Sequence, residues 1–231
     1  MGWMCAGVLS ISLVLGFTRS IFLLGAPAGL LYLLWFWRRW LVIAVPLAAA
    51  LAILVAPQSV QERVISAFQP HGETDSNTHR MITRRTGIEM IRKHPWFGLG
   101  PEQVKAQFND YVPADIPRPL PDGWYGHLHN IYLQFAAERG IPAALAFFWM
   151  IGKMLYDFWI ALRRGRGDPE ARFILHGAVA VILAILAEGF FEYNLGDSEV
   201  LTMFLTLVGF GYIAREMPAP VSVPEAAQVA A

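Results

Sequence analysis

Apolar residues in this chain of 231 residues come in long runs, which short charged clusters separate from one another. A bilayer core of about 30 Å needs roughly 20 apolar residues per helix. Six stretches approach this length: about 3–17, 21–37, 41–56, 142–162, 173–191 and 199–214. The pattern therefore predicts an all-α fold, a polytopic bundle of transmembrane helices.

Arginines in the short connections set the predicted orientation of this bundle. Arg38 and Arg39 follow the second run, a basic cluster at 163–172 follows the fourth, and Arg215 follows the sixth. Because basic loops stay in the cytoplasm, all three connections are expected on the cytoplasmic side. The predicted regions are three helices over 1–56, a periplasmic loop with short helices over 57–141, three helices over 142–214, and a disordered cytoplasmic tail over 215–231.

Composition narrows the classes of function. The chain is 55% hydrophobic and 16% charged with a formal net charge of zero, so nothing indicates binding to nucleic acid. The single cysteine, Cys5, excludes a disulfide framework and a cysteine metal site. Glu188 and Glu192 lie near the external end of the fifth run, but its middle, GAVAVILAILA, has no ionisable residue. This argues against a proton-coupled transporter.

The long external segment carries the first group of candidate binding residues. THRMITRRTGIEMIRKH reads as a helix ended by Pro95, and a second short helix is expected near 102–111. Arg80 and Arg84 are four residues apart and share a helix face, where guanidinium groups suit a phosphate or diphosphate. A solvated helix face is the alternative. Arg19 lies at the external end of the first run, where it is expected to be either an interfacial anchor or a contact to a ligand.

The segment GHLHNIYLQFAAERGIP, residues 126–142, is unusually polar for its place before an apolar run. Gly140 and Pro142 are expected to break the helix there, so the polar groups lie outside the hydrocarbon. His127 and His129 find no third and fourth ligand at a fitting spacing, so no metal site is predicted. A histidine is a suitable general base at neutral pH.

Two further polar residues of this segment have simple structural interpretations. Asn130 is placed to cap the helix that follows it. Glu138 stands next to Arg139, with which it can pair locally. We include His127, Asn130 and Glu138 as candidate supporting residues, because they flank or follow His129 in the same segment.

Three segments in order resemble the O-antigen ligase and O-antigen polymerase superfamily of bacterial membrane glycosyltransferases. FTRSIFLLGAPAGLLYLL is similar to its Arg-containing stretch at the opening of a membrane helix. RMITRRTGIEMIRKHPWFGLGPEQV is similar to its Arg-containing helix followed by His-Pro-x-x-Gly-x-Gly, and HLHNIYLQFAAERGIP to its His-Asn-x-Tyr-Leu-Gln stretch. The last two apolar runs match only in pattern.

The resemblance implies transfer of a glycan from undecaprenyl diphosphate to an acceptor hydroxyl, at the periplasmic face of the bacterial inner membrane. No metal or other cofactor is implied; the expected partners are the lipid-linked donor, a glycan or lipid A-core acceptor, and membrane lipids. By motif position, His129 corresponds to the essential histidine of the family, and Arg80 and Arg19 to its diphosphate-binding arginines. Arg84 is a further candidate for the diphosphate through the helix face it shares with Arg80, although its position is often aromatic in the family.

Several alternatives stay open from the sequence. Ala143 stands where ligases often carry Gly, Thr or Tyr, so ligase, polymerase and protein glycosyltransferase are not distinguished. Members of the family usually have ten or more spans, and this chain is expected to begin in the middle of the family fold. A truncated, non-catalytic membrane partner of the same ancestry is therefore the second hypothesis, and a flippase the third.

Overall fold

The structure is a computed structural model that describes residues 24–58, 61, 76–121, 123, 125–164 and 168–217. Regular structure in these ranges is entirely helical, as predicted. The helices are α2 (Ala26–Trp37), α3 (Leu41–Val55), α5 (Ser76–Lys93), α6 (Gln103–Tyr111), α7 (Ile131–Arg139), α8 (Ile141–Arg163), α9 (Pro169–Glu188), the 3-10 helix η2 (Asn194–Gly196) and α10 (Ser198–Glu216). The first predicted run, 3–17, and the tail from 218 lie outside the described residues.

Two of the described helices, α8 and α9, are long and apolar enough to cross a membrane by length and composition. They correspond to the predicted runs 142–162 and 173–191. α2 and α3 are also apolar but span only 12 and 15 residues. The predicted six-span topology therefore stays a prediction, whereas the all-α class is confirmed for the described part of the chain.

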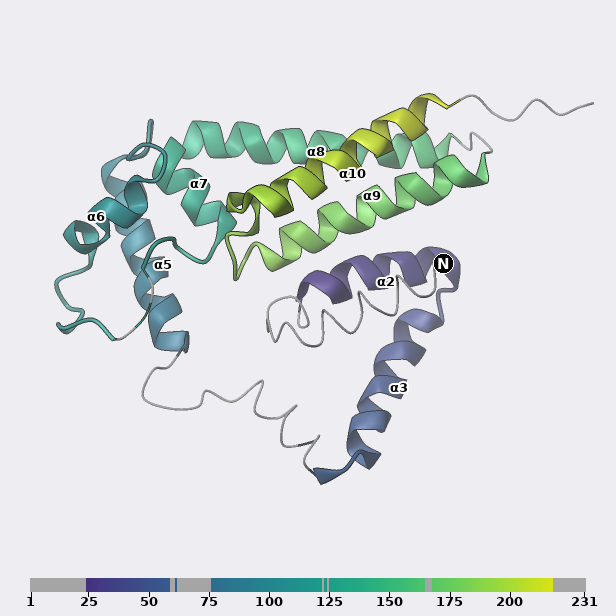
Figure 1. Ribbon diagram of the computed structural model, residues 1–231, viewed down its shortest axis with the longest axis horizontal. Coiled ribbons are helices and arrows are strands. Elements are labelled where there is room, and N and C mark those ends of the chain that lie inside the picture. The colour runs from purple at the N-terminus through teal and green to yellow at the C-terminus, as the bar shows by residue number, and fades with distance from the viewer. Residues whose placement is uncertain are drawn as a thin grey trace, which may run out of the picture.

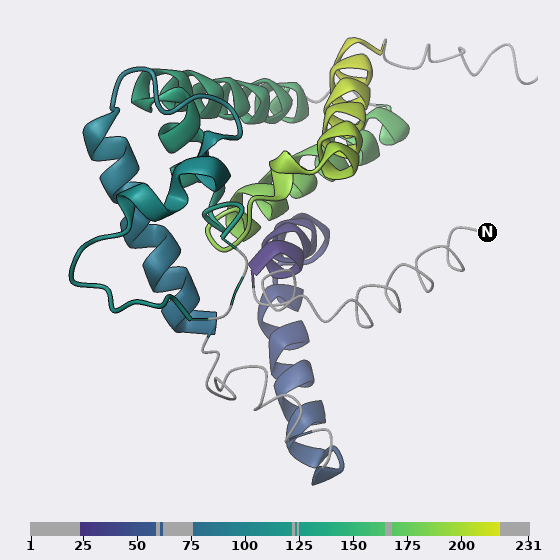
Figure 2. The ribbon, with the colours of Figure 1, turned by 60° about the vertical axis from the view of Figure 1, so that its left-hand side comes forward.

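The helices form two packed groups. α8, α9 and α10 run alongside one another, and α2 lies along α9, while α5, α6 and α7 gather at one end of the long helices (Figure 1). Gly29 permits the close approach of α2, because an added Cβ would lie 3.0 Å from the carbonyl oxygen of Ala180 in α9. α3 extends away from the other helices (Figure 2).

The end group has a core of its own. Its buried side chains come from α5, α6, α7 and the segments beside them: Ile82, Met90, Val104, Phe108, Ile116, Leu128 and Ala137. Thr83 and Thr86 are fully buried on the same side of α5. Because α5 is oriented in this way, Arg80 and Arg84 lie on a different face of the helix from these buried side chains.

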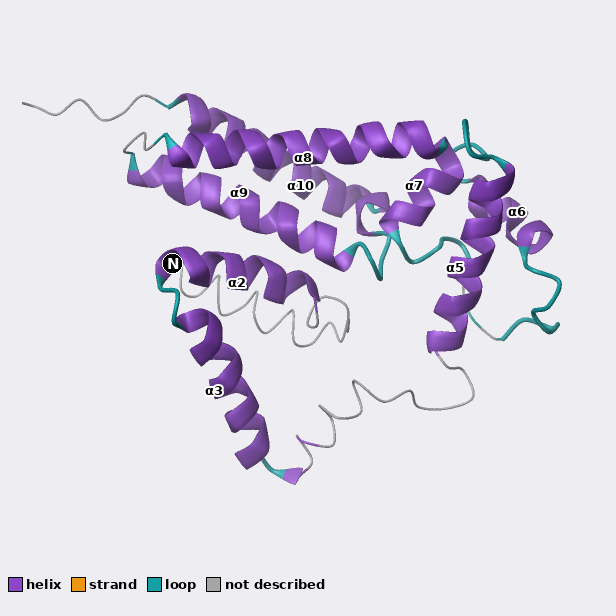
Figure 3. Cartoon of the chain, turned by 180° about the vertical axis from the view of Figure 1, so that it is seen from behind, coloured by secondary structure: helices purple, strands orange, loops and turns teal. Residues whose placement is uncertain are grey.

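A sharp break separates α7 from α8, seen from behind in Figure 3. Gly140 has φ +82°, and an added Cβ would collide with the carbonyl oxygen of Trp96. The N–H of Ile141 donates to the carbonyl oxygen of Pro95 at 2.8 Å. Only glycine fits this left-handed, closely packed position, so the predicted helix break at Gly140 is confirmed.

Candidate functional site

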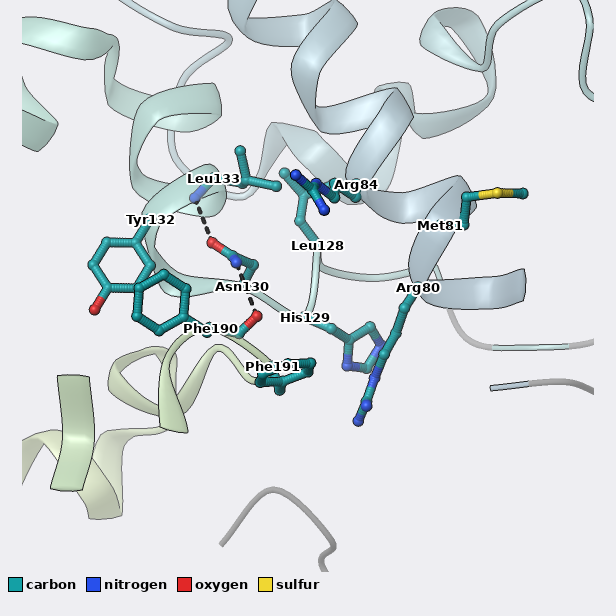
Figure 4. Close-up of a pocket in the computed structure, with 10 residues that line it drawn as sticks. All are labelled: Arg80, Met81, Arg84, Leu128, His129, Asn130, Tyr132, Leu133, Phe190 and Phe191. Atoms are coloured by element: carbon teal, nitrogen blue, oxygen red, sulfur yellow. Dashed lines mark hydrogen bonds between the residues drawn. The ribbon is translucent and has the colours of Figure 1, made fainter. Parts of the chain in front are cut away.

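A pocket of about 610 Å³ lies where α5, the start of α7 and the connection after α9 meet (Figure 4). Its lining residues are Arg80, Met81, Arg84, Leu128, His129, Asn130, Tyr132, Leu133, Phe190 and Phe191. Four of the sequence-predicted site residues therefore line one cavity: Arg80, Arg84, His129 and Asn130. Arg19 lies outside the described residues.

The two arginines of the pocket differ in their surroundings. The guanidinium of Arg80 stacks over the ring of Phe191, 5.5 Å from its centroid. In Figure 4 the side chains of Arg80 and His129 point toward the end of the pocket where Phe191 lies, and Arg84 lies at the other end beside Leu128. Among the described residues, no carboxylate forms an ion pair with either arginine. Both guanidinium groups are thus suited to an anionic ligand.

Arg85, next to Arg84, has a different role. It binds Asp115 through two hydrogen bonds of 2.8 and 2.9 Å. This bond to Asp115 raises the pKa of Arg85, and the same contact lowers the pKa of Asp115. Asp115 lies in the proline-rich connection after α6, so this pair fastens that connection to α5. Arg85 is therefore a structural arginine beside two that face the pocket.

His129 is held in a rare backbone conformation. Its φ is +47°, in the left-handed region that side chains other than glycine seldom adopt. The preceding Leu128 is buried in the core of the end group, and its N–H donates to Oε1 of Gln134 at 2.8 Å. Burial of Leu128 places the two flanking histidines together, with ring centroids of His127 and His129 4.1 Å apart.

Glu192, in the connection after α9, accepts contacts from both histidines. Its Oε1 is 3.3 Å from Nδ1 of His129 and 3.5 Å from Nε2 of His127. Burial alone would raise the pKa of Glu192, but the hydrogen bond and the electrostatic effect of His129 outweigh it and lower this pKa. An ionised carboxylate only accepts hydrogen bonds. The ring proton of neutral His129 therefore lies on Nδ1, which leaves the lone pair on Nε2.

His127 is uncharged at neutral pH. Burial lowers its pKa to about 4, and the neighbouring His129 contributes to the shift. Its Nδ1 accepts the backbone N–H of His129 at 3.0 Å, so its own proton lies on Nε2 and points toward Glu192. His127 thus fixes both the backbone of His129 and the carboxylate that holds the His129 ring.

His127, His129 and Glu192 also meet a first condition for a metal site, since one ligand atom from each lies within 4.8 Å of the others. The sequence spacing had provided no third ligand, and Glu192 is one. However, a metal facing Glu192 would need the lone pair of Nε2 of His127. Moving that proton to Nδ1 would set it against the N–H of His129, so two donors would face each other. The arrangement suits hydrogen bonds around one carboxylate better than metal ligation.

Asn130 caps α7, as predicted. Its side-chain oxygen accepts the N–H of Leu133 at 2.9 Å, and its amide nitrogen donates to the carbonyl oxygen of Phe190 at 2.9 Å. The N–H of Ile131 adds a bond to the carbonyl oxygen of Gly189 at 2.8 Å. Asn130 therefore joins two of the three chain segments that form the pocket, the start of α7 and the connection after α9.

Glu138 lies away from the pocket, at the other end of α7. It is 3% exposed and accepts hydrogen bonds from Gln134, the N–H of Glu102 and Arg139, at 2.8, 3.0 and 2.7 Å. Its contact with Arg139 is the local pair that the sequence predicted. Glu138 thus fastens the segment before α6 to α7 and acts on the pocket only through the fold.

Sequence reasoning missed Glu192, Phe190 and Phe191 as site residues. They are about 60 positions from His129 in the chain and reach it only through the packing of α9 near the start of α7. The signal available was the position of Glu192 at the external end of a predicted span, on the same side of the membrane as His129.

The comparisons with known proteins bear on these same helices. The model of the O-antigen ligase family matches residues 4–148, a range that contains Arg80, Arg84 and His129 and ends before Glu192. The comparison with curated proteins gave no match. The family match covers more than half of the 231 residues. On the strength of that match, the chain belongs to the O-antigen ligase family.

Proposed function

We propose that this chain transfers a glycan from undecaprenyl diphosphate to an acceptor hydroxyl at the periplasmic face of the bacterial inner membrane, in the synthesis of cell-surface polysaccharide such as lipopolysaccharide. The observation that carries the proposal is the single pocket that Arg80, Arg84 and His129 line together. The pocket combines positive charge for a diphosphate with a nitrogen base for a hydroxyl. Membership of the O-antigen ligase family supports the same reaction class.

The proposed reaction exchanges one bond to the anomeric carbon of the donor sugar for another. The acceptor oxygen forms a bond to that carbon while the carbon–oxygen bond to the diphosphate breaks. Nε2 of His129 takes the hydroxyl proton as general base. Arg80 and Arg84 stabilise the negative charge that develops on the departing diphosphate, a role that the family resemblance also implies for Arg19. This mechanism uses no metal.

Glu192 is the positioning residue in this scheme. Its hydrogen bond to Nδ1 keeps the His129 proton away from Nε2 and stabilises the imidazolium that forms when the hydroxyl proton arrives. His127 and Asn130 hold the backbone on either side of His129. Nε2 of His129 is buried in this structure, so an acceptor hydroxyl reaches it only after a neighbouring side chain moves.

The placement of α7 supports a site at the external membrane surface. α7 begins against the end of α9, through the bond from Ile131 to Gly189, and ends where α8 begins. If α8 and α9 cross the bilayer, α7 lies across two of their ends on one side of it. The pocket at the start of α7 is then within reach of a diphosphate whose lipid tail stays in the membrane.

The direct test of the reaction is the identity of the lipid product. Purified chain in liposomes is supplied with an undecaprenyl-diphosphate-linked glycan and a labelled lipid A-core acceptor, or a second glycan as acceptor. We expect equimolar glycosylated acceptor and free undecaprenyl diphosphate, measured by mass spectrometry, because the bond to the anomeric carbon is the one that breaks. Undecaprenyl monophosphate as product would contradict the mechanism. Binding of the donor with no transfer to either acceptor would favour the non-catalytic membrane partner.

A further inference from the structure

The loop of residues 94–99, between α5 and α6, exposes two large aromatic side chains beside the start of α8. Trp96 is 72% exposed and Phe97 is 89% exposed. We propose that this loop is an interfacial anchor whose aromatic tip inserts into the boundary between lipid headgroups and acyl chains of the external leaflet. The inference depends on α8 crossing the membrane and is independent of the proposed reaction.

The loop is locked to the first turn of α8. The carbonyl oxygen of Pro95 accepts the N–H of Ile141 at 2.8 Å, and the carbonyl of Trp96 packs directly against Gly140. Leu99 and Gly100 donate their N–H groups to the carbonyl oxygens of Ala137 and Glu138, at 2.8 and 2.9 Å. The height of Trp96 and Phe97 along the membrane normal is thus fixed by α8 itself.

The exposed surface of α8 continues from this loop. Ile141, Leu145 and Trp149 are all exposed and follow one another at intervals of four residues, so they form one apolar stripe along the helix. The stripe begins at the residue that binds Pro95. A surface that is apolar along a membrane-length helix is covered by lipid when it faces outward, and the aromatic tip extends that surface at its external end.

The residue types around the tip suit the interfacial zone. Tryptophan is enriched at the level of the lipid headgroups, because its indole ring is apolar while its ring N–H is polar. Lys93, just before the loop, lies 5.0 Å above the ring of Tyr111, and Nε2 of His94 lies 2.7 Å from the hydroxyl of the same tyrosine. Lys93 and His94 are thereby held against α6, where they can meet lipid phosphates. The aromatic tip of the loop extends beyond them.

Depth-dependent fluorescence quenching tests the anchor in the full chain. Because Cys5 is the single cysteine, Cys5→Ala provides a background in which Phe97→Cys takes one environment-sensitive fluorophore. Asp110→Cys, exposed on α6, is the matched control, and Leu145→Cys is the reference within α8. Each labelled chain is placed in phosphatidylcholine and phosphatidylglycerol liposomes that carry a nitroxide at the headgroup, at acyl carbon 5 or at acyl carbon 12.

We expect the label at position 97 to be quenched most by the headgroup and carbon-5 nitroxides, about threefold or more above the label at position 110. The label at position 145 is expected to be quenched most by a deeper nitroxide than the label at position 97, because Leu145 lies about 6 Å along α8 from Ile141, the residue that binds Pro95. Equal quenching at positions 97 and 110 would overturn the anchor, and so would protection of position 97 by a second protein surface. Circular dichroism of each labelled chain verifies that the fold is kept.

Discussion

Replacement of His129 by asparagine is expected to lower the rate of glycan transfer by about 10³-fold, within the range of a lost general base. Asparagine tolerates the left-handed backbone that His129 adopts, so the loop keeps its conformation while the base is removed. His129→Ala should give the same loss with a larger effect on thermal stability. The rate is measured with saturating donor and acceptor in liposomes.

Two variants separate the base from its surroundings. His94→Gln removes a histidine of the same external segment that is bound to Tyr111 and lies outside the pocket, and transfer should stay at the wild-type rate. The transfer rate of Glu192→Gln should fall between those of His129→Asn and His94→Gln, with a loss of about 10–100-fold. The hydrogen bond to Nδ1 of His129 weakens in this variant, but Nε2 of His129 remains as the base. Wild-type transfer by His129→Asn would exclude His129 as the base.

Arg80→Ala is the second substitution with a large expected effect, a decrease of about 10²-fold or more in the transfer rate. The reason is the loss of a guanidinium that stabilises charge on the leaving diphosphate. Arg80→Lys should recover only part of the rate, because an ammonium group keeps the charge but not the planar, bidentate geometry. The contact of Arg80 with Phe191 provides a preformed orientation that lysine would not reproduce.

The matched control for Arg80 is Arg85→Ala, on the same helix. Arg85 is bound to Asp115 at the surface, so its loss should change transfer by less than about threefold, as is typical of exposed ion pairs. A binding measurement with undecaprenyl diphosphate separates affinity from rate for each variant. Equal transfer rates for Arg80→Ala and Arg85→Ala would contradict the assignment of the diphosphate to Arg80.

Local signals in the sequence accounted for much of the site. Gly140 and Pro142 predicted the end of α7 and the start of α8, since both residues restrict which conformations the neighbouring backbone can adopt in a helix. The spacing of Arg80 and Arg84 predicted a shared face of α5, and both line the pocket. These features depend on neighbours within a few residues, which a periodic pattern can express.

The features of the site that the sequence did not predict depend on packing between segments that are distant in the chain. No spacing rule relates Glu192 to His129, because their contact is created by the way α9 ends near α7. Glu138 illustrates the opposite case, since its place in the polar segment suggested a supporting role but its side chain turns into a buried network at the far end of α7. Arg85 pairs with Asp115 across a proline-rich connection whose path the composition does not specify.

The measurement that tests the central claim most directly is photocrosslinking of the donor. A diazirine placed on the sugar next to the diphosphate of an undecaprenyl-diphosphate-linked glycan is activated in liposomes, and the labelled peptides are mapped by mass spectrometry. The proposed site predicts crosslinks within α5, at 128–133 and at 190–192, which excess undecaprenyl diphosphate removes and Arg80→Ala weakens. Crosslinks that concentrate on α3 or on the far end of α8 near Arg163, and that Arg80→Ala leaves unchanged, would contradict it.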